Sequence, residues 1–217
     1  MVAGAMAVTA FAGTANAVTT FDAALLDPPG VYYGTGNPNS GFTVDTENGI
    51  ELGLGTQMRF GAAVAPSPIT GNIYYVPAGY YPSTTDALWN FRYSVNLQTS
   101  GSTLSTITPT ITISDLFNAP VSFNPLAFGP ATYLNVGFQD SQNIGFSGGY
   151  YNPLLNDTYT ITLSVLDANN NSLGSVTEVI NATPLPSTWL MLLSGFVGLG
   201  FFAYRGSKKN AAALAAA

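Results

Sequence analysis

The sequence contains no cysteine and no histidine among its 217 residues. Without cysteine, no disulfide framework holds the fold. The absence of both residues also excludes serine-triad and cysteine-protease catalysis, together with the usual zinc ligand sets. Charged residues are scarce as well, at 7% of the chain. We therefore expect a protein that is not an enzyme and that carries no catalytic residue, no metal site and no cofactor.

Basic residues are almost missing from the body of the chain. All eleven acidic residues lie between Asp22 and Glu178, where Arg59 and Arg92 are the only basic residues, so this stretch has a net charge of −9. Nucleic-acid binding needs a basic surface that displaces counterions from phosphates. The charge balance thus argues against DNA or RNA as a partner. The other three basic residues follow the last apolar run and are Arg205, Lys208 and Lys209.

Carboxylates are the remaining candidates for chemistry. Asp45, Glu47 and Glu51 are close in sequence, and glycosidases work with two carboxylates, one of which has a raised pKa. Such charges more often form the solvated face of a turn, and we expect that here. The stretch does not match a calcium loop, because Gly49 is fifth rather than sixth when counted from Asp45.

Glycine (23 residues), tyrosine (12) and phenylalanine (13) are plentiful. Short runs of alternating apolar and polar residues, separated by Gly, Pro, Asn and Ser, are typical of antiparallel strands with one buried face. The pattern predicts an all-β fold, an antiparallel β-sandwich of the jelly-roll-like or immunoglobulin-like type. The nine expected strands cover 42–46, 50–54, 57–64, 72–76, 88–97, 106–114, 132–138, 158–167 and 172–181.

Three local signals give this prediction detail. Asn48-Gly49 indicates a tight hairpin, because a type I′ turn needs positive φ at both central residues. Residues 167–171 are expected to close the last hairpin. In the segment from Trp89 to Val95 the aromatic and branched residues fall on one face, which predicts a central core strand.

The N-terminal residues 1–17 resemble a secretory signal peptide. A small, apolar run precedes Ala15-Asn16-Ala17, and Ala15 and Ala17 supply the small-x-small pattern that signal peptidase accepts. No basic n-region precedes the run, so the start of the signal is expected to be truncated. A buried N-terminal helix is the alternative. The secreted domain then covers 18–181.

The C-terminal region carries a second apolar segment. Residues 189–204 are uncharged and, as a helix, would span about 24 Å. A bilayer core is about 30 Å thick, so flanking residues must complete the crossing. We expect a spacer at 182–187, a transmembrane helix with a basic stop at 188–209 and an Ala-rich tail at 210–217. A buried core helix is the alternative. The basic residues would mark the cytoplasmic side.

The order of these features resembles a known export signal. A Pro-containing motif, an apolar helix and a basic cluster follow one another, as in the PEP-CTERM sorting signal of exported bacterial proteins. The motif residues are Pro184, Leu185, Pro186, Ser187, Thr188 and Trp189, and the membrane stop is Arg205, Lys208 and Lys209. The resemblance implies a membrane-embedded exosortase as the processing partner. Leu185 stands where the family has Glu, so cleavage by the usual enzyme, cleavage by a variant and permanent anchoring all remain open.

These features predict an exported structural protein, anchored at the cell surface or released to an extracellular, biofilm-type matrix and associated with its polysaccharide. The alternative is a carbohydrate-binding module, because neighbouring tyrosines on a strand face opposite sides and one ring of each doublet can be exposed for stacking on sugars. A ring that packs inward or covers a loop is the simpler explanation. The candidate glycan contacts are Tyr32, Tyr33, Tyr74, Tyr75, Tyr80, Tyr81, Tyr150 and Tyr151.

Overall fold

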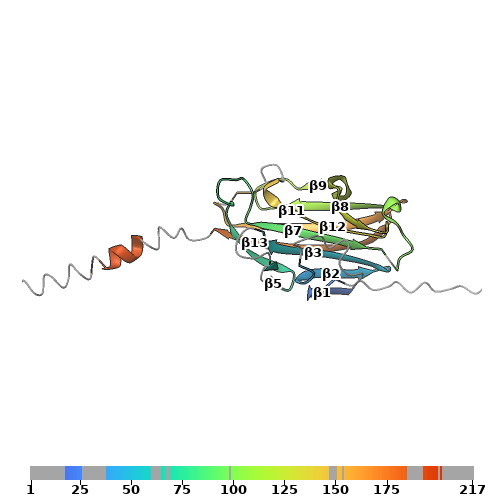
Figure 1. Cartoon of the computed structure of the whole chain (residues 1–217), viewed down its shortest axis with the longest axis horizontal. Helices are drawn as coiled ribbons and strands as arrows, with labels where there is room; N and C mark the ends of the chain where they lie inside the picture. The colour runs from blue at the N-terminus through green and yellow to red at the C-terminus, as the bar shows by residue number, and fades with distance from the viewer. Residues whose placement is uncertain are drawn as a thin grey trace, which may run out of the picture. The chain divides into compact units, whose positions relative to one another are not determined.

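Most of the alternating segments form strands, and these build two antiparallel sheets packed as a β-sandwich (Figure 1). The computed structural model describes residues 18–25, 38–59, 65–66, 69–97, 99–146, 151–152, 154–184, 193–199 and 201. The chain divides into one compact unit, residues 1–183, and a second unit, residues 184–217. All described strands up to residue 183 belong to the first unit.

Sheet A contains the strand that the sequence predicts to be central. Its order is β1 (Val18–Ala23), β2 (Phe42–Glu47), β3 (Ile50–Met58), β7 (Trp89–Asn96), β11 (Gly137–Asn143) and β10 (Ala131–Tyr133), with β4 (Ala65–Pro66) paired to β3. Strand β7 lies in the middle of this order, as expected. Its partners β3 and β11 both run antiparallel to it.

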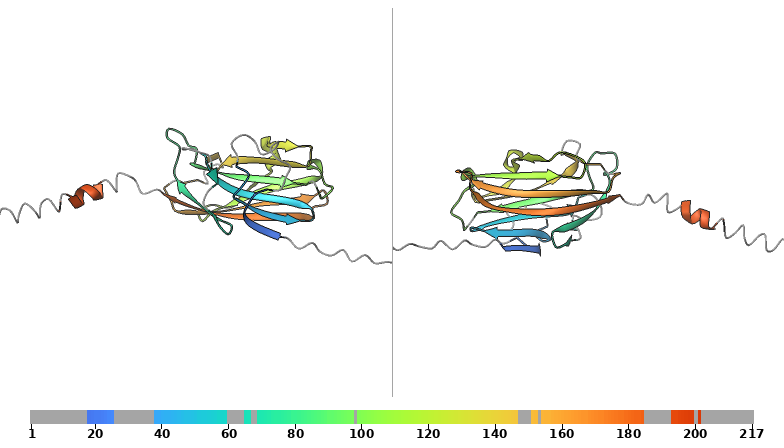
Figure 2. Two further views of the ribbon diagram at one scale, coloured as in Figure 1. Left: turned by 60° about the horizontal axis from the view of Figure 1, so that its bottom comes forward. Right: turned by 180° about the vertical axis from the view of Figure 1, so that it is seen from behind.

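Sheet B contains the last strand of the unit near its centre. Its order is β5 (Ile69–Thr70), β6 (Ile73–Ala78), β13 (Ser172–Pro184), β12 (Asp157–Asp167), β8 (Ile107–Ser114) and β9 (Val121–Phe123). Three short 3₁₀ helices connect strands: η1 (Leu104–Thr106), η2 (Pro125–Phe128) and η3 (Ile144–Phe146). The long strands of both sheets run in similar directions (Figure 2), which is the aligned type of sandwich packing.

The core lies between the two sheets. Strand β7 contributes every second residue from Trp89 to Val95, and all four of these side chains are buried. Sheet B supplies branched residues from β8, β12 and β13, such as Ile111, Leu163 and Ile180. Removal of one large aromatic side chain from such a core costs about 3–5 kcal/mol. These contacts stabilise the sandwich in the absence of disulfide bonds.

The outer face of sheet A is covered too, which the alternation did not predict. Arg92 of β7 points to this face and is fully buried, and its guanidinium donates hydrogen bonds to the backbone carbonyls of Pro38, Ser40 and Gly41. A Cβ atom at Gly53 would lie 2.5 Å from Leu25 Cδ2. Residues on both sides of the β1–β2 connection therefore pack over the sheet, so the polar face of β7 is not solvated.

Both predicted hairpins are present. Asn48 and Gly49 have φ angles of 52° and 75°, as a type I′ turn requires. The backbone N–H of Asp167 donates to the carbonyl of Asn171 and closes the β12–β13 hairpin. The expected strand at 132–138 was wrong in one respect. Leu134 and Asn135 both have positive φ, so the chain turns there and forms β10 and β11 instead.

The ends of two other elements differ from the prediction. Strand β3 continues through Gly55 to Met58, where the sequence suggested a break after residue 54. Gly55 is needed within the strand because a Cβ atom there would lie 2.8 Å from the Arg92 Nη2 atom. Strand β13 ends at Pro184, so the expected spacer at 182–187 begins inside a strand.

The second unit is described only at residues 193–199 and 201, which are helical. Its large apolar side chains are exposed, among them Phe196 at 61% and Val197 at 71%. In the described part of the chain, no helix reaches the length and apolar character that a membrane crossing requires. The helix expected at 188–209 thus stays a prediction, since most of its residues lie outside the described ones.

Candidate functional site

The clustered carboxylates Asp45 and Glu51 do not meet in one site. Asp45 faces the sandwich interior and accepts a hydrogen bond of 2.9 Å from the Thr19 hydroxyl, whereas Glu51 lies on the opposite face of the hairpin. Asp45 is 3% exposed and Glu51 5%. The expected solvated turn face was therefore wrong for these two residues, because packing on both faces of sheet A buries them. Carboxylates on opposite faces cannot act on one bond.

A carboxylate that the sequence reasoning missed lies in the core. Glu178 of β13 is fully buried between the sheets, and one of its oxygens accepts a hydrogen bond of 3.3 Å from the Thr56 hydroxyl. The other oxygen has no hydrogen-bond partner. Burial raises the pKa of Glu178 to about 8, against the opposing effects of Arg92 and Thr56. Glu178 occupies the apolar face of a strand that the sequence predicts, and this position could have indicated that it is buried.

The nearby Arg92 and Tyr74 are also perturbed by burial. Desolvation lowers the pKa of Arg92 to about 10. Desolvation and the charge of Glu178 raise the pKa of Tyr74 above its ordinary value. The Tyr74 hydroxyl donates to the backbone carbonyls of Gly41 and Leu54. This buried cluster holds the β1–β2 connection to both sheets.

The tyrosine doublets separate into buried and exposed rings. Tyr74 is fully buried and Tyr151 is 6% exposed, so the expected glycan contacts are wrong for these two. Tyr75 (46%), Tyr80 (41%) and Tyr81 (42%) are exposed. Alternation explains Tyr74 and Tyr75, which occupy neighbouring positions of β6.

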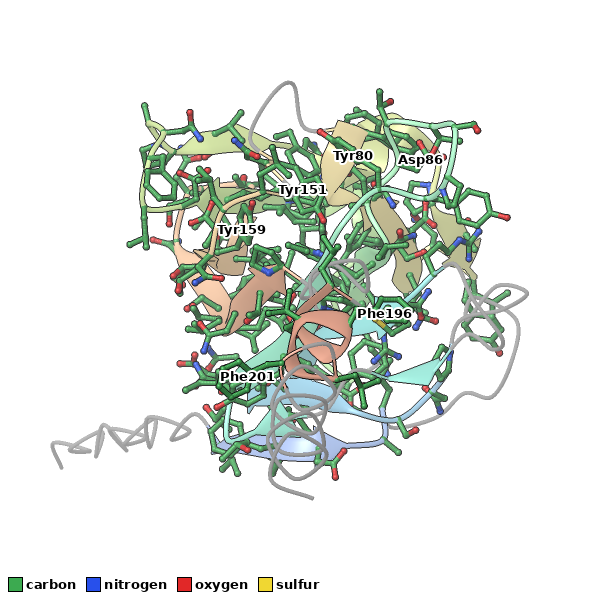
Figure 3. All side chains as sticks on the ribbon, turned by 90° about the vertical axis from the view of Figure 1, so that its left-hand side faces the viewer. Tyr80, Asp86, Tyr151, Tyr159, Phe196 and Phe201 are labelled. Atoms are coloured by element: carbon green, nitrogen blue, oxygen red, sulfur yellow. The ribbon has the colours of Figure 1, made fainter. Side chains whose placement is uncertain are left out.

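Tyr80 and Tyr151 begin a row of aromatic rings at one end of the sandwich (Figure 3). The Tyr80 ring packs edge-on against Tyr151, with 5.5 Å between ring centroids. Tyr151 in turn contacts Trp89 and Tyr159 of the core. The Tyr151 hydroxyl accepts from the backbone N–H of Gly79 and donates to its carbonyl, at 2.6 and 2.7 Å. The exposed ring is thereby connected to the rigid interior.

Tyr80 and Tyr81 belong to a short ladder that we call the tyrosine loop, residues 79–87. Tyr80 pairs with Ala87 in an antiparallel bridge, and the Tyr81 N–H donates to the Asp86 carbonyl at 2.8 Å. Asn143 holds the base of the loop, because its side chain bonds both the N–H and the carbonyl of Ala87 at 2.8 Å. Residues opposite each other in such a ladder share one face. Tyr81 and Asp86 thus lie opposite each other, and their side chains leave the backbone on the same side.

Several predicted site residues lie outside the described part of the chain. Pro184 alone of the sorting motif is described, at the end of β13. The remainder lie outside, namely Leu185, Pro186, Ser187, Thr188, Trp189, Arg205, Lys208, Lys209, Ala15, Ala17, Tyr32, Tyr33 and Tyr150. Within the described residues, no three acidic side chains gather as metal ligands would.

Comparison with known proteins gives no relative. A scan against protein-family models, a search of curated proteins and a search of solved structures each return no match for this chain.

Proposed function

We propose that this chain is an exported structural protein whose β-sandwich stands outside the cell and whose C-terminal region serves as an anchoring and sorting tail of the PEP-CTERM type. A signal peptide at 1–17 directs export, a helix within 188–209 holds the chain in the membrane, and an exosortase-like enzyme processes the tail. The protein is anchored at the cell surface or released to the extracellular matrix with its polysaccharide.

One structural observation carries this proposal: the compact β unit stops at Thr183, where the sorting motif begins. The unit that follows has a helical segment with exposed apolar side chains, including Leu193, Phe196 and Phe201. Large exposed apolar side chains in one segment favour contact with a membrane or another apolar surface. The three basic residues after this segment would keep its end in the cytoplasm.

Mass spectrometry of intact protein tests the proposal. Protein from the cell fraction and from the surrounding matrix would be compared for both termini. We expect an N-terminus at Val18 in both fractions and a C-terminus within 183–187 only in the matrix. Intact termini at Ala217 in both fractions would instead show permanent anchoring. Retention of residues 1–17 in exported protein would overturn the signal-peptide assignment.

Neutral replacement of the basic stop tests the electrostatic part. A triple variant with Gln at Arg205, Lys208 and Lys209 should show weaker membrane retention before processing. The matched control replaces Arg59 by Gln, which removes a positive charge from the body instead of the tail. Equal retention of the triple variant and the unchanged protein would contradict the proposed role of these residues.

A further inference from the structure

We propose that the tyrosine loop is a binding site for neutral polysaccharide, in which the Tyr81 ring stacks on a pyranose and the Asp86 carboxylate accepts hydrogen bonds from its hydroxyl groups. This site belongs to the β unit and does not depend on the fate of the C-terminal tail. Of the four tyrosine doublets that the sequence offered as glycan contacts, the proposal keeps the one in this loop.

The loop brings an aromatic ring and a carboxylate together. Tyr81 is 42% exposed and is joined to Asp86 by the backbone hydrogen bond described above, so both side chains lie on one face of the ladder. An aromatic ring offers an apolar face to the C–H groups of a sugar, while a carboxylate accepts bonds from hydroxyl groups. The ring can therefore contact the C–H face of a pyranose while the carboxylate binds its hydroxyl groups.

Hydrogen bonds hold the loop in place before any ligand binds. The Thr84 hydroxyl donates to the Tyr81 carbonyl at 2.9 Å and accepts from the Asp86 N–H at 3.1 Å. Asn143 and Tyr151 fix the two sides of the base, as described above. Binding then requires little ordering of the protein, and preorganisation of this kind increases affinity.

Tyr80 extends the same loop with a second exposed ring. Its hydroxyl donates to the Tyr151 carbonyl at 3.4 Å, and its edge-on contact with Tyr151 leaves 41% of the residue exposed. Consecutive residues of a ladder point to opposite sides. A long polymer that wraps around the loop can contact a ring on each side, whereas a single sugar would contact only one.

The charge of the protein selects the kind of polysaccharide. The stretch from Asp22 to Glu178 has a net charge of −9, and the loop itself contains Asp86 and no basic residue. An anionic polymer would be repelled by this surface. We therefore expect neutral glucans or galactans to bind and uronic-acid polymers such as alginate not to bind.

Affinity gel electrophoresis in non-ionic detergent measures this binding with the full chain. The protein is acidic, with a pI of about 4.1, and migrates toward the anode, whereas a neutral polysaccharide embedded in the gel does not move. Hydroxyethyl cellulose, laminarin and a soluble galactan are the probes, and alginate is the anionic control. Tyr→Ala variants keep the charge, so a change in relative mobility reports binding directly.

We expect Tyr81→Ala to weaken binding about tenfold and Tyr80→Ala to weaken it less. Tyr75→Ala is the matched control, since Tyr75 is equally exposed but lies on β6 outside the loop. Asp86→Asn should weaken binding while it leaves the thermal midpoint unchanged. Failure of the unchanged protein to bind any neutral probe would overturn the proposal. Equal loss in Tyr75→Ala and Tyr81→Ala would overturn it as well.

Discussion

Replacement of Glu178 by Gln should remove most of the pH dependence of stability between pH 5 and 8. Glu178 is fully buried, and its pKa is about 8 in the folded protein against 4.5 for an exposed glutamate. From pH 4.5 to 8 the unfolded chain ionises at this residue while the folded chain keeps the proton. Stability from this group is therefore complete below pH 4.5 and is lost as the pH rises to about 8.

The magnitude follows from the difference between the two pKa values. Each pH unit within the window lowers the free energy of unfolding by about 1.4 kcal/mol, and the whole window by about 5 kcal/mol. Total stabilities of domains are about 5–15 kcal/mol, so the effect is large. Neither histidine nor cysteine is present to titrate in this range. Asp140, whose pKa is also raised by burial, contributes with the same sign.

Urea unfolding at pH 5, 6, 7, 8 and 9, followed by circular dichroism, measures the effect. We expect falling stability up to pH 8 for the unchanged protein and a nearly level profile for Glu178→Gln. Asp140→Asn is the control that removes a second acid whose pKa is raised by burial. Thr56→Val should move the end of the slope to higher pH, since the Thr56 hydroxyl favours the charged form. A level profile for the unchanged protein would refute the reasoning.

Three further predictions concern the fold. Arg92→Lys should destabilise the protein by about 2–4 kcal/mol in urea unfolding, because one ammonium cannot replace the guanidinium bonds to several carbonyls; an unchanged midpoint would contradict this. Gly49→Ala should cost more than Gly71→Ala, since both have positive φ but only the first places Cβ 2.9 Å from the Thr99 backbone; equal losses would exclude the contact. A chain of residues 18–184 should melt cooperatively in calorimetry, and a broad transition would show that it depends on the removed ends.

The sequence was sufficient to predict the sandwich because its strands are strongly alternating. The segment from Trp89 to Val95 places its aromatic rings on one face, and that face is the core. The hairpin at Asn48-Gly49 was predictable because the turn type demands those residues. The turn at Leu134 was not, since leucine rarely adopts positive φ. The pairing of β10 with β11 holds the turn there, together with hydrogen bonds from the N–H groups of Leu104 and Leu97, which are distant in sequence.

The alternation of apolar and polar residues did not predict that polar residues would be buried. Arg92 alternates with apolar neighbours, which predicts that its side chain faces solvent. In the structure, backbone carbonyls from residues 38–41 cover it. Tyr80 and Tyr81 could be singled out as a doublet, but their selection required the pairing of residues 80–81 with 86–87. Contacts between residues distant in sequence decide both cases, and local periodicity carries no information about them.

The position of β13 determines when the sandwich can close during synthesis. This strand is the last to be made, yet it lies between β6 and β12 in sheet B. Its bonds reach far back along the chain, from Thr177 to Asn72 over 105 residues and from Glu178 to Thr56 over 122. Until residue 184 has been produced, β6 and β12 have no strand between them, so sheet B is completed late. A protease that cuts after Pro184 therefore meets a finished domain, whereas a cut before Ser172 would detach β13 and leave β6 and β12 without the strand between them.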